Sequence, residues 1–386
     1  MNMQRLLIPI LACLFATTAW ADVEINETTF PDANFRNWVL GQEYGSDGVL
    51  TDEEIASVKN INVAGKEIQS LKGIEFFTAL TRLTCPSNQL TELDLSRNIK
   101  LKNVYCIDNQ LTSLDLTSNT ELIELDCLEN QLQTLNVSNI NLSRLNCENN
   151  QLTELNVSGC TSLSSLNCSF NQLASIDVST CAGLTSFACV QNLLTEIDVS
   201  KNSRLNSLEC SANKLTTLDL SGCMKLVTLH CDENLLTSLD VSMCQEMSYL
   251  SCYSNLLTSL TLDVSNTELL YIYCYNNQIK GEAMDLLVAN LPTRNDIPGS
   301  LIIHNKVYET EQNEMSSEQV SIVKKNNWQP LDSGWNEYAG YDVFNVLNSP
   351  RAAAPNAQCI YNLSGQRITR PRKGLFITGG RKVVVK

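Results

Sequence analysis

Ten cysteines recur at a nearly constant spacing through the middle of this 386-residue chain. They lie 20 to 22 residues apart, at Cys85, Cys106, Cys127, Cys147, Cys168, Cys189, Cys210, Cys231, Cys252 and Cys274. Asparagines follow with the same period about three residues later, from Asn88 to Asn277. A fixed period of about twenty residues indicates a solenoid, in which each turn packs only on its neighbours. Such an architecture favours a binding role over an enzymatic one.

One repeat unit runs from Leu83 to Leu101, and both halves follow the pattern Leu-x-x-Leu-x-apolar-x-x-Asn. The apolar residue is Cys in the first half and Leu or Val in the second. Alternating inward residues predict a short strand in each half. The asparagine amide after each cysteine can bond backbone groups of neighbouring turns. The predicted fold class is mainly β with helical caps, a solenoid of about ten 21-residue turns with short strands on both faces.

The sixteen cysteines are better explained as buried thiols than as a disulfide framework. Neighbouring parallel strands place inward side chains about 4.8 Å apart, whereas disulfides prefer Cβ atoms about 3.8 Å apart. We expect the ladder cysteines to act as small buried hydrophobes. For the partial second column, Cys160/Cys181 and Cys223/Cys244, disulfides remain an alternative. No Cys-x-x-Cys pair occurs, so zinc is not indicated.

The pattern Leu-x-x-Leu-x-Cys-x-x-Asn-x-Leu-Thr-x-Leu-Asp-Val-Ser is nearly complete at 205–221 and 226–242. It resembles the leucine-rich repeat family, in particular the bacterial internalin-like branch with a cysteine ladder, and the resemblance covers residues 61–280. The resemblance implies a secreted or surface-exposed, adhesin-like binder. It would recognise a host or bacterial surface protein or a glycan through the concave face of the repeats, as a monomer without a cofactor.

The regions outside the repeats have distinct compositions. Residues 1–21 read as a secretory signal peptide, because Arg5 precedes a short apolar run and Ala19-Trp20-Ala21 forms a cleavage site. Residues 22–60 are predicted to form a helical cap, with one helix at 31–40 and another beginning at the capping box of Thr51. Residues 281–332 are predicted to form an α/β cap with helices at 282–291 and 317–326 and a strand at 300–304. Residues 333–358 read as a linker.

Residues 359–386 are predicted to form a basic β tail. The last 36 residues carry eight basic and no acidic side chains, although the whole chain has a formal charge of −15. The acidic remainder excludes nucleic acid as a partner, and no later stretch predicts an integral membrane span. The Gly-Gln-Arg, Gly-Leu-Phe-Ile and Lys-Val-Val-Val-Lys runs resemble the sorting tails of Bacteroidetes proteins exported by the type IX route. The alternative is a small β appendage with no special role.

Aromatic residues predict a ligand-binding surface near the end of the repeats. The candidates are His230, Tyr249, Tyr253, Tyr271, Tyr273 and Tyr275. Because strand side chains alternate, all six should point away from the core and lie side by side on neighbouring turns. Such rings suit sugars or apolar side chains. The alternative is that they only stabilise strand pairing.

The segment from Glu43 to Glu54 resembles a calcium-binding EF-hand loop. This resemblance predicts Glu43, Asp47 and Glu54 as metal ligands. Gly45, at the third place, offers no carboxylate. The acids at 52–54 alternatively favour a helix N-terminus.

A column of aspartates also recurs with the repeat, at Asp94, Asp115, Asp177, Asp198, Asp219 and Asp240, completed by Asn136 and Asn156. This column could bind cations, or each side chain could accept a hydrogen bond from the backbone of its own turn. We expect the local hydrogen bonds.

Catalysis has little support in the sequence. The only histidines are His230 and His304, and no nucleophile motif accompanies either of them. We therefore expect no enzyme. A structural surface component and a glycan-active enzyme are the alternatives from other functional classes.

Overall fold

The computed structural model describes residues 22–138 and 140–341, and the backbone of four short strands further on. The chain divides after Gly340 into two compact units. In the second unit, β20 (Ile360–Tyr361), β21 (Arg367–Ile368), β22 (Gly374–Thr378) and β23 (Arg381–Val385) pair antiparallel in the order β21-β20-β22-β23. The predicted signal peptide, the linker at 342–358 and the remainder of the tail lie outside the described residues.

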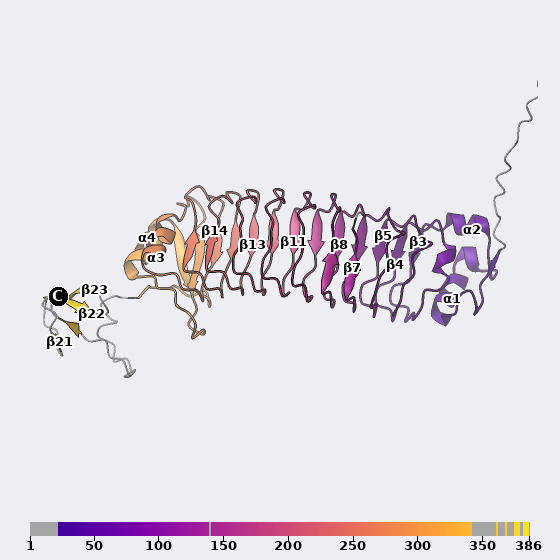
Figure 1. The fold of residues 1–386 in the computed structure, drawn as a ribbon, viewed down its shortest axis with the longest axis horizontal. Helices are drawn as coiled ribbons and strands as arrows, with labels where there is room; N and C mark the ends of the chain where they lie inside the picture. The colour runs from indigo at the N-terminus through magenta and orange to yellow at the C-terminus, as the bar shows by residue number, and fades with distance from the viewer. Residues whose placement is uncertain are drawn as a thin grey trace, which may run out of the picture. The chain divides into compact units, whose positions relative to one another are not determined.

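The first unit is a stack of turns joined by one parallel sheet of thirteen strands (Figure 1). In spatial order these are β3 (Asn60–Asn62), β4 (Arg82–Thr84), β5 (Asn103–Tyr105), β6 (Glu124–Asp126), β8 (Arg144–Asn146), β10 (Ser165–Asn167), β11 (Ser186–Ala188), β12 (Ser207–Glu209), β13 (Thr228–His230), β15 (Tyr249–Ser251), β17 (Tyr271–Tyr273), β18 (Gly299–His304) and β19 (Trp328–Asp332). The central inward residues pair in register, as Leu145 does with Leu166 and Leu166 with Phe187. We call the outward surface of this sheet the ladder face.

The predicted strands on the opposite face form in four turns of the described repeats, and the other turns carry no strand there. There β7 (Thr134–Asn136) pairs with β9 (Glu154–Asn156), and β14 (Ser238–Asp240) with β16 (Ser259–Thr261). Two backbone hydrogen bonds lie at the ends of each strand pair. In the first pair they run from Thr153 N to Gln133 O and from Val137 N to Asn156 O. In most other turns a single backbone hydrogen bond, such as Gln110 N to Leu90 O, joins the second halves of neighbouring repeat units.

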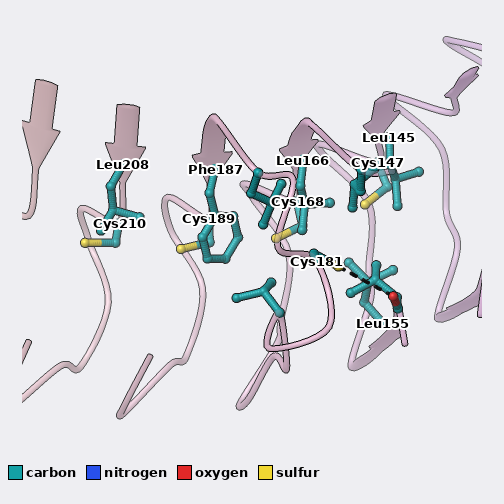
Figure 2. Packing of buried hydrophobic residues seen from close by; sticks show 14 of the residues in the cluster. Leu145, Cys147, Leu155, Leu166, Cys168, Cys181, Phe187, Cys189, Leu208 and Cys210 are labelled. Carbon is teal, nitrogen blue, oxygen red and sulfur yellow. Dashed lines mark hydrogen bonds between the residues drawn. The ribbon is translucent and has the colours of Figure 1, made fainter. Parts of the chain in front are cut away.

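The core is a continuous column of leucine and cysteine side chains, as predicted. Figure 2 shows Cys147, Cys168, Cys189 and Cys210 following one another on successive turns. All four are fully buried, and each of the fourteen described cysteines is a free thiol. Burial raises the pKa of Cys168 to about 12. In the second column, the Cys160 thiol donates to Val137 O at 3.1 Å, so these cysteines also serve as packing and weak donors.

The asparagine after each ladder cysteine binds backbone groups of adjacent turns, which confirms its predicted role. Asn109 Nδ2 donates to Cys85 O and Cys106 O, both at 3.1 Å, and its Oδ1 accepts from Leu90 N at 3.1 Å. The same set of bonds recurs at Asn130, Asn150, Asn171, Asn192, Asn213, Asn234, Asn255 and Asn277. These side chains therefore satisfy backbone groups that the corner would otherwise bury without partners.

Both caps contain the predicted elements. The N-terminal cap holds α1 (Ala33–Leu40), the antiparallel pair of β1 (Val23–Glu24) and β2 (Val49–Leu50), and α2 (Asp52–Ser57). Thr51 and Glu54 form the expected capping box of α2. The C-terminal cap holds α3 (Glu282–Ala289) and α4 (Ser317–Lys325) beside β18 and β19. None of the described helices is long and apolar enough to cross a bilayer.

The predicted linker begins later than residue 333. Glu337 bridges antiparallel to Leu331, Tyr338 N donates to Pro330 O at 2.9 Å, and the Tyr338 ring packs on the core. Residues 333–338 therefore fold back onto the last strand. Gly334 and Gly340 suggest a linker here, and no local sequence pattern predicts the bridge, because the partner strand lies in the cap.

Candidate functional site

The six aromatic candidates meet on the ladder face near the C-terminal cap. The His230 and Tyr249 rings stack with centroids 4.8 Å apart. Tyr249 also lies 5.4 Å from Tyr273 and 6.1 Å from Tyr271. Strand register produces this arrangement, because Tyr249 pairs with Tyr271 and the odd-numbered residues of both strands point outward.

A second group of rings lies where the chain leaves these strands. Tyr253 and Tyr275 stack at 4.6 Å with their planes 8° apart, and Tyr308 extends the stack 6.3 Å beyond Tyr275. Trp335 meets Tyr273 edge-on at 6.0 Å. We call these eight side chains, the six candidates with Tyr308 and Trp335, the aromatic patch.

The patch combines exposed rings with partly buried ones. Tyr271, Tyr308 and Trp335 are 40%, 43% and 54% exposed, whereas the remaining five are half-buried. Burial raises the pKa of Tyr249 and of Tyr275 to about 12. The two phenols are therefore neutral at physiological pH and can donate hydrogen bonds to a ligand.

Two carboxylates border the stack of Tyr253 and Tyr275. Asp232 is 7% exposed, and one of its oxygens accepts from Ser251 Oγ at 2.6 Å. Burial raises the pKa of Tyr253, and the negative charges of Asp232 and the exposed Glu233 raise it further. Within residues 22–138 and 140–341, no lysine, arginine or histidine forms an ion pair with either carboxylate. The edge of the patch is thus acidic, and no basic side chain of the described residues forms an ion pair with its two carboxylates.

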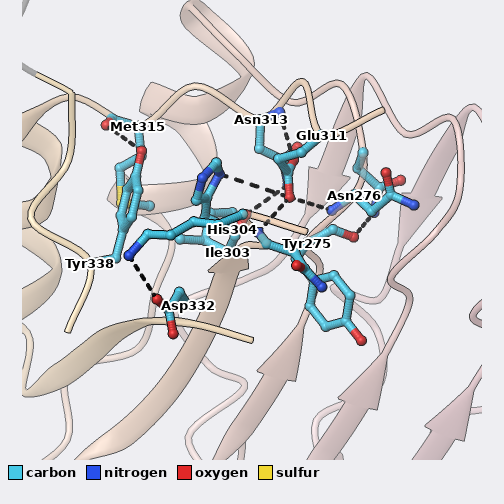
Figure 3. A network of polar contacts seen from close by, with 12 residues as sticks. Tyr275, Asn276, Ile303, His304, Glu311, Asn313, Met315, Asp332 and Tyr338 are labelled. Atoms are coloured by element: carbon cyan, nitrogen blue, oxygen red, sulfur yellow. Dashed lines mark hydrogen bonds and ion pairs between the residues drawn. The ribbon is translucent and has the colours of Figure 1, made fainter. Parts of the chain in front are cut away.

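A buried glutamate holds the loop that carries Tyr308 (Figure 3). Glu311 Oε2 accepts from Asn276 N at 2.6 Å and Asn305 N at 3.0 Å, and Oε1 accepts from Asn313 N at 2.9 Å. Its side chain is only 3% exposed, and His304 Nδ1 lies 4.0 Å away. These bonds connect the loop to the turn of Tyr275, so the cap positions the end of the aromatic stack.

The calcium candidates lie in the N-terminal cap. Glu54 Oε2 accepts from Thr51 N and Thr51 Oγ1, at 2.9 and 2.8 Å, and Asp47 Oδ1 accepts from Val49 N at 3.1 Å. Glu43 begins a short 3-10 helix, η1 (Glu43–Gly45). No three acidic, histidine or cysteine side chains of the described segments converge as a metal site. Helix capping explains the position of the Glu54 side chain. Calcium binding stays a prediction, and it is tested by measuring the melting temperature with calcium and with a chelator.

The aspartate column lies on the face opposite the ladder face and bonds locally, as expected. Asp198 Oδ1 accepts from Ser200 N at 2.9 Å, and Asn136 makes the same bond to Ser138 N. Near the N-terminal end, a polar groove of about 590 Å³ runs along this face between Glu75 and Asp115. We call it the polar groove.

Sequence reasoning missed Tyr308 and Trp335. Both come from the non-repeating cap, and Trp335 lies in the segment predicted to be a linker. No periodic signal marks either residue, since their place depends on how the cap folds back. The excess of tyrosines in the last two repeats was the only available pointer to this end of the ladder face.

Comparisons with known proteins agree with the fold. Internalin J of Listeria monocytogenes serotype 4b (strain F2365) is 38% identical over 70 residues, which span 18% of this chain and 8% of internalin J. The functional domain of InlJ from Listeria monocytogenes, described as including a cysteine ladder, is 26% identical, covers 81% of both chains and has a TM-score of 0.48. An internalin (inlF) from the same species is 26% identical over 75% of this chain and 94% of its own, with a TM-score of 0.54. No protein-family model matches.

The ladders, the likeness to the inlF structure and the match to internalin J together identify the architecture. The chain is an internalin-like leucine-rich-repeat solenoid with a cysteine ladder. Repeat solenoids present extended, regular surfaces that commonly mediate protein binding.

Proposed function

Because the chain is an internalin-like leucine-rich-repeat solenoid, we propose that it is a secreted or surface-exposed binding protein. It recognises a host or bacterial surface protein or a glycan through the ladder face, and the aromatic patch is the contact surface. The cluster of eight outward rings on the last turns and the cap carries this proposal. Export through the predicted signal peptide and, by the tail resemblance, the type IX route belongs to the same proposal.

Physical chemistry supports the patch as a contact surface. Tyrosine and tryptophan combine large apolar area with a hydrogen-bonding group, and both are enriched in binding hot spots. The stacked turns and the bonds of Glu311 hold the rings in place before a ligand arrives. A ligand that meets ordered side chains loses less conformational entropy on binding.

One observation favours a different role, that of a structural surface component. Most of the rings stack on one another, and the parallel contact of Tyr253 and Tyr275 stabilises the pairing of their own turns. Under this alternative the patch adds stability to the C-terminal end and contacts no ligand. The purified protein would then assemble with itself and bind nothing else.

Binding to an array of glycans and host proteins separates these roles. The test variant changes Tyr253, Tyr271, Tyr273 and Tyr275 together to Ser. The matched control is Tyr105→Ser, because Tyr105 also points outward from the ladder face but lies in β5, far along the stack. Selective binding that is lost in the test variant and kept in the control supports the proposal. Binding that survives in a folded test variant contradicts it.

A further inference from the structure

We propose that the aromatic patch takes a cationic group, namely the ammonium or guanidinium of a lysine or arginine side chain on a protein partner. This inference rests on the proposed function and specifies its ligand. Three features of the described residues carry it: ring faces open to solvent, uncompensated carboxylates beside them, and a matching contact within the chain.

The rings offer faces on which a cation can rest. The planes of Tyr271 and Tyr273 are inclined to that of Tyr249 by 45° and 34°, so the three rings do not cover one another completely. Tyr271 is 40% exposed. A cation within about 6 Å of such a ring is attracted by the negative face of its π system. The cluster therefore provides several adjoining sites for one positive charge.

The carboxylates supply the second component. Asp232 and Glu233 lie close enough for their charges to raise the pKa of both Tyr253 and Tyr275. In the described part of the chain, neither carboxylate has a basic partner. Asp332, by contrast, pairs with Lys306 at 3.1 Å. A lysine or arginine from outside would neutralise charge that the chain itself leaves unpaired.

The chain already makes one contact of this kind on the same face. The Arg82 guanidinium lies 4.6 Å from the centroid of the Tyr105 ring, and the Tyr105 hydroxyl donates to Glu124. Tyrosine, carboxylate and guanidinium thus form a complete set between β4 and β6. At the aromatic patch the tyrosines and the carboxylates are present, and the cation is the component that a partner would bring.

Charge also decides between ligand classes. Glycans that carry sulfate or carboxylate groups would be repelled by Asp232 and Glu233, and by the net charge of −15 on the chain. A neutral sugar would gain stacking but would leave the carboxylates uncompensated. A basic protein segment satisfies both parts of the patch.

Peptides of one design test the inference. Each has a fluorescent label and four identical residues separated by Gly-Ser, and the four residues are lysine, trimethyllysine, glutamine or glutamate. Fluorescence anisotropy at low and at physiological salt gives the Kd for the purified protein. We expect the lysine and trimethyllysine peptides to bind about tenfold or more tightly than the glutamine peptide, because both keep the charge. The glutamate peptide should not bind.

Matched variants locate the binding. Glu233→Gln changes an exposed side chain, and Asp232→Asn keeps an acceptor for Ser251, so both should fold. Each should weaken the lysine peptide about threefold or more, as should Tyr275→Leu. The control is Asp115→Asn, which removes the same charge on the opposite face and keeps an acceptor for Thr117 N. It should leave the affinity unchanged.

The outcomes separate this inference from the proposed function. Equal weakening by Asp115→Asn and Glu233→Gln would show that the peptide binds general acidity, and it would overturn the inference. A neutral glycan that binds only when the tyrosines are present, with no binding of the lysine peptide, would also overturn it and leave the proposed function standing. Absence of every ligand from the patch would overturn both.

Discussion

The two asparagine columns of the solenoid should differ in their contribution to stability. Asn171 belongs to the column that follows the ladder cysteines, and among the described residues its Oδ1 is the one acceptor bonded to Leu152 N, at 2.9 Å. Its Nδ2 donates a hydrogen bond to Cys147 O at 3.0 Å, and Asn150 Nδ2 donates a second hydrogen bond to the same carbonyl oxygen. Asn171→Cys would therefore leave one backbone N–H without a partner but would leave the carbonyl bonded.

Asn202 belongs to the second column, and its bonding is less complete. Its Nδ2 donates to Val178 O and Cys181 O, at 3.1 and 2.9 Å, but its buried Oδ1 has no partner. The adjacent turns place Cys181 and Cys223 at the equivalent position, each donating from sulfur to a carbonyl. Asn202→Cys thus reproduces an environment that the protein already contains.

The expected magnitudes follow from these counts. A buried N–H without a partner costs about 1–3 kcal/mol, and each lost hydrogen bond costs about 0.5–1.5 kcal/mol net. Asn171→Cys should therefore lower the free energy of unfolding by about 2–4 kcal/mol. Asn202→Cys should lower it by about 1 kcal/mol or less, because the lost bonds are offset by removal of an unsatisfied buried oxygen.

Urea unfolding followed by circular dichroism measures both variants, with Gln172→Ala as an exposed neighbour that should change little. An equal decrease in the free energy of unfolding in the two asparagine variants would refute the reasoning, because the hydrogen bond from Leu152 N would then contribute nothing to stability. A larger decrease for Asn202→Cys than for Asn171→Cys would refute it more strongly.

Three further predictions concern the same solenoid. Ala212 has a φ of 53°, so Ala212→Gly should stabilise the protein by about 0.5–1 kcal/mol in thermal unfolding, whereas Ala188→Gly in the extended strand β11 should destabilise it by a similar amount. The bond from Ser200 N lowers the pKa of Asp198, and equivalent bonds act on other members of the column. The stability they contribute is present above the unfolded pKa near 4 and is lost as the pH falls through the folded pKa. Replacing Asp94, Asp115, Asp177, Asp198 and Asp219 with Asn removes this contribution at every pH, so the free energy of unfolding should fall less steeply between about pH 5 and pH 2 than in the unchanged protein, and an unchanged slope would contradict this. Cys168→Ser buries a hydroxyl at a fully enclosed site, so it should cost about 1–3 kcal/mol, and an unchanged melting temperature would count against that burial.

The repeating part of the fold could be predicted because every turn meets the same neighbours. The spacing from Cys85 to Cys274 therefore predicted the sheet, the buried thiols and the bonds of the asparagines. The N-terminal cap was predictable for a local reason, since Thr51 and Glu54 form a box within four residues. The outward direction of Tyr249 and Tyr271 followed from strand alternation.

Other features had no local signal. Ten residues that precede the ladder asparagines have φ of 50–55°, yet they include Phe170, Ala212 and Glu233 and share no side-chain type. Trp335 lies at the aromatic patch because residues 333–338 fold back on β19. Strand pairing on the second face occurs in four of the described turns, although all turns share one repeat pattern. Each of these features is set by tertiary contacts that a repeat pattern does not encode.

The most direct test of the central claim is radical footprinting of the protein, read by mass spectrometry, with and without a ligand selected on the array. We predict protection at Tyr271, Tyr275, Tyr308 and Trp335, which lie together on the aromatic patch. Tyr105, on the same face in β5, should keep its reactivity. Protection confined to the polar groove on the opposite face, with unchanged labelling of the four aromatic residues, would contradict the account.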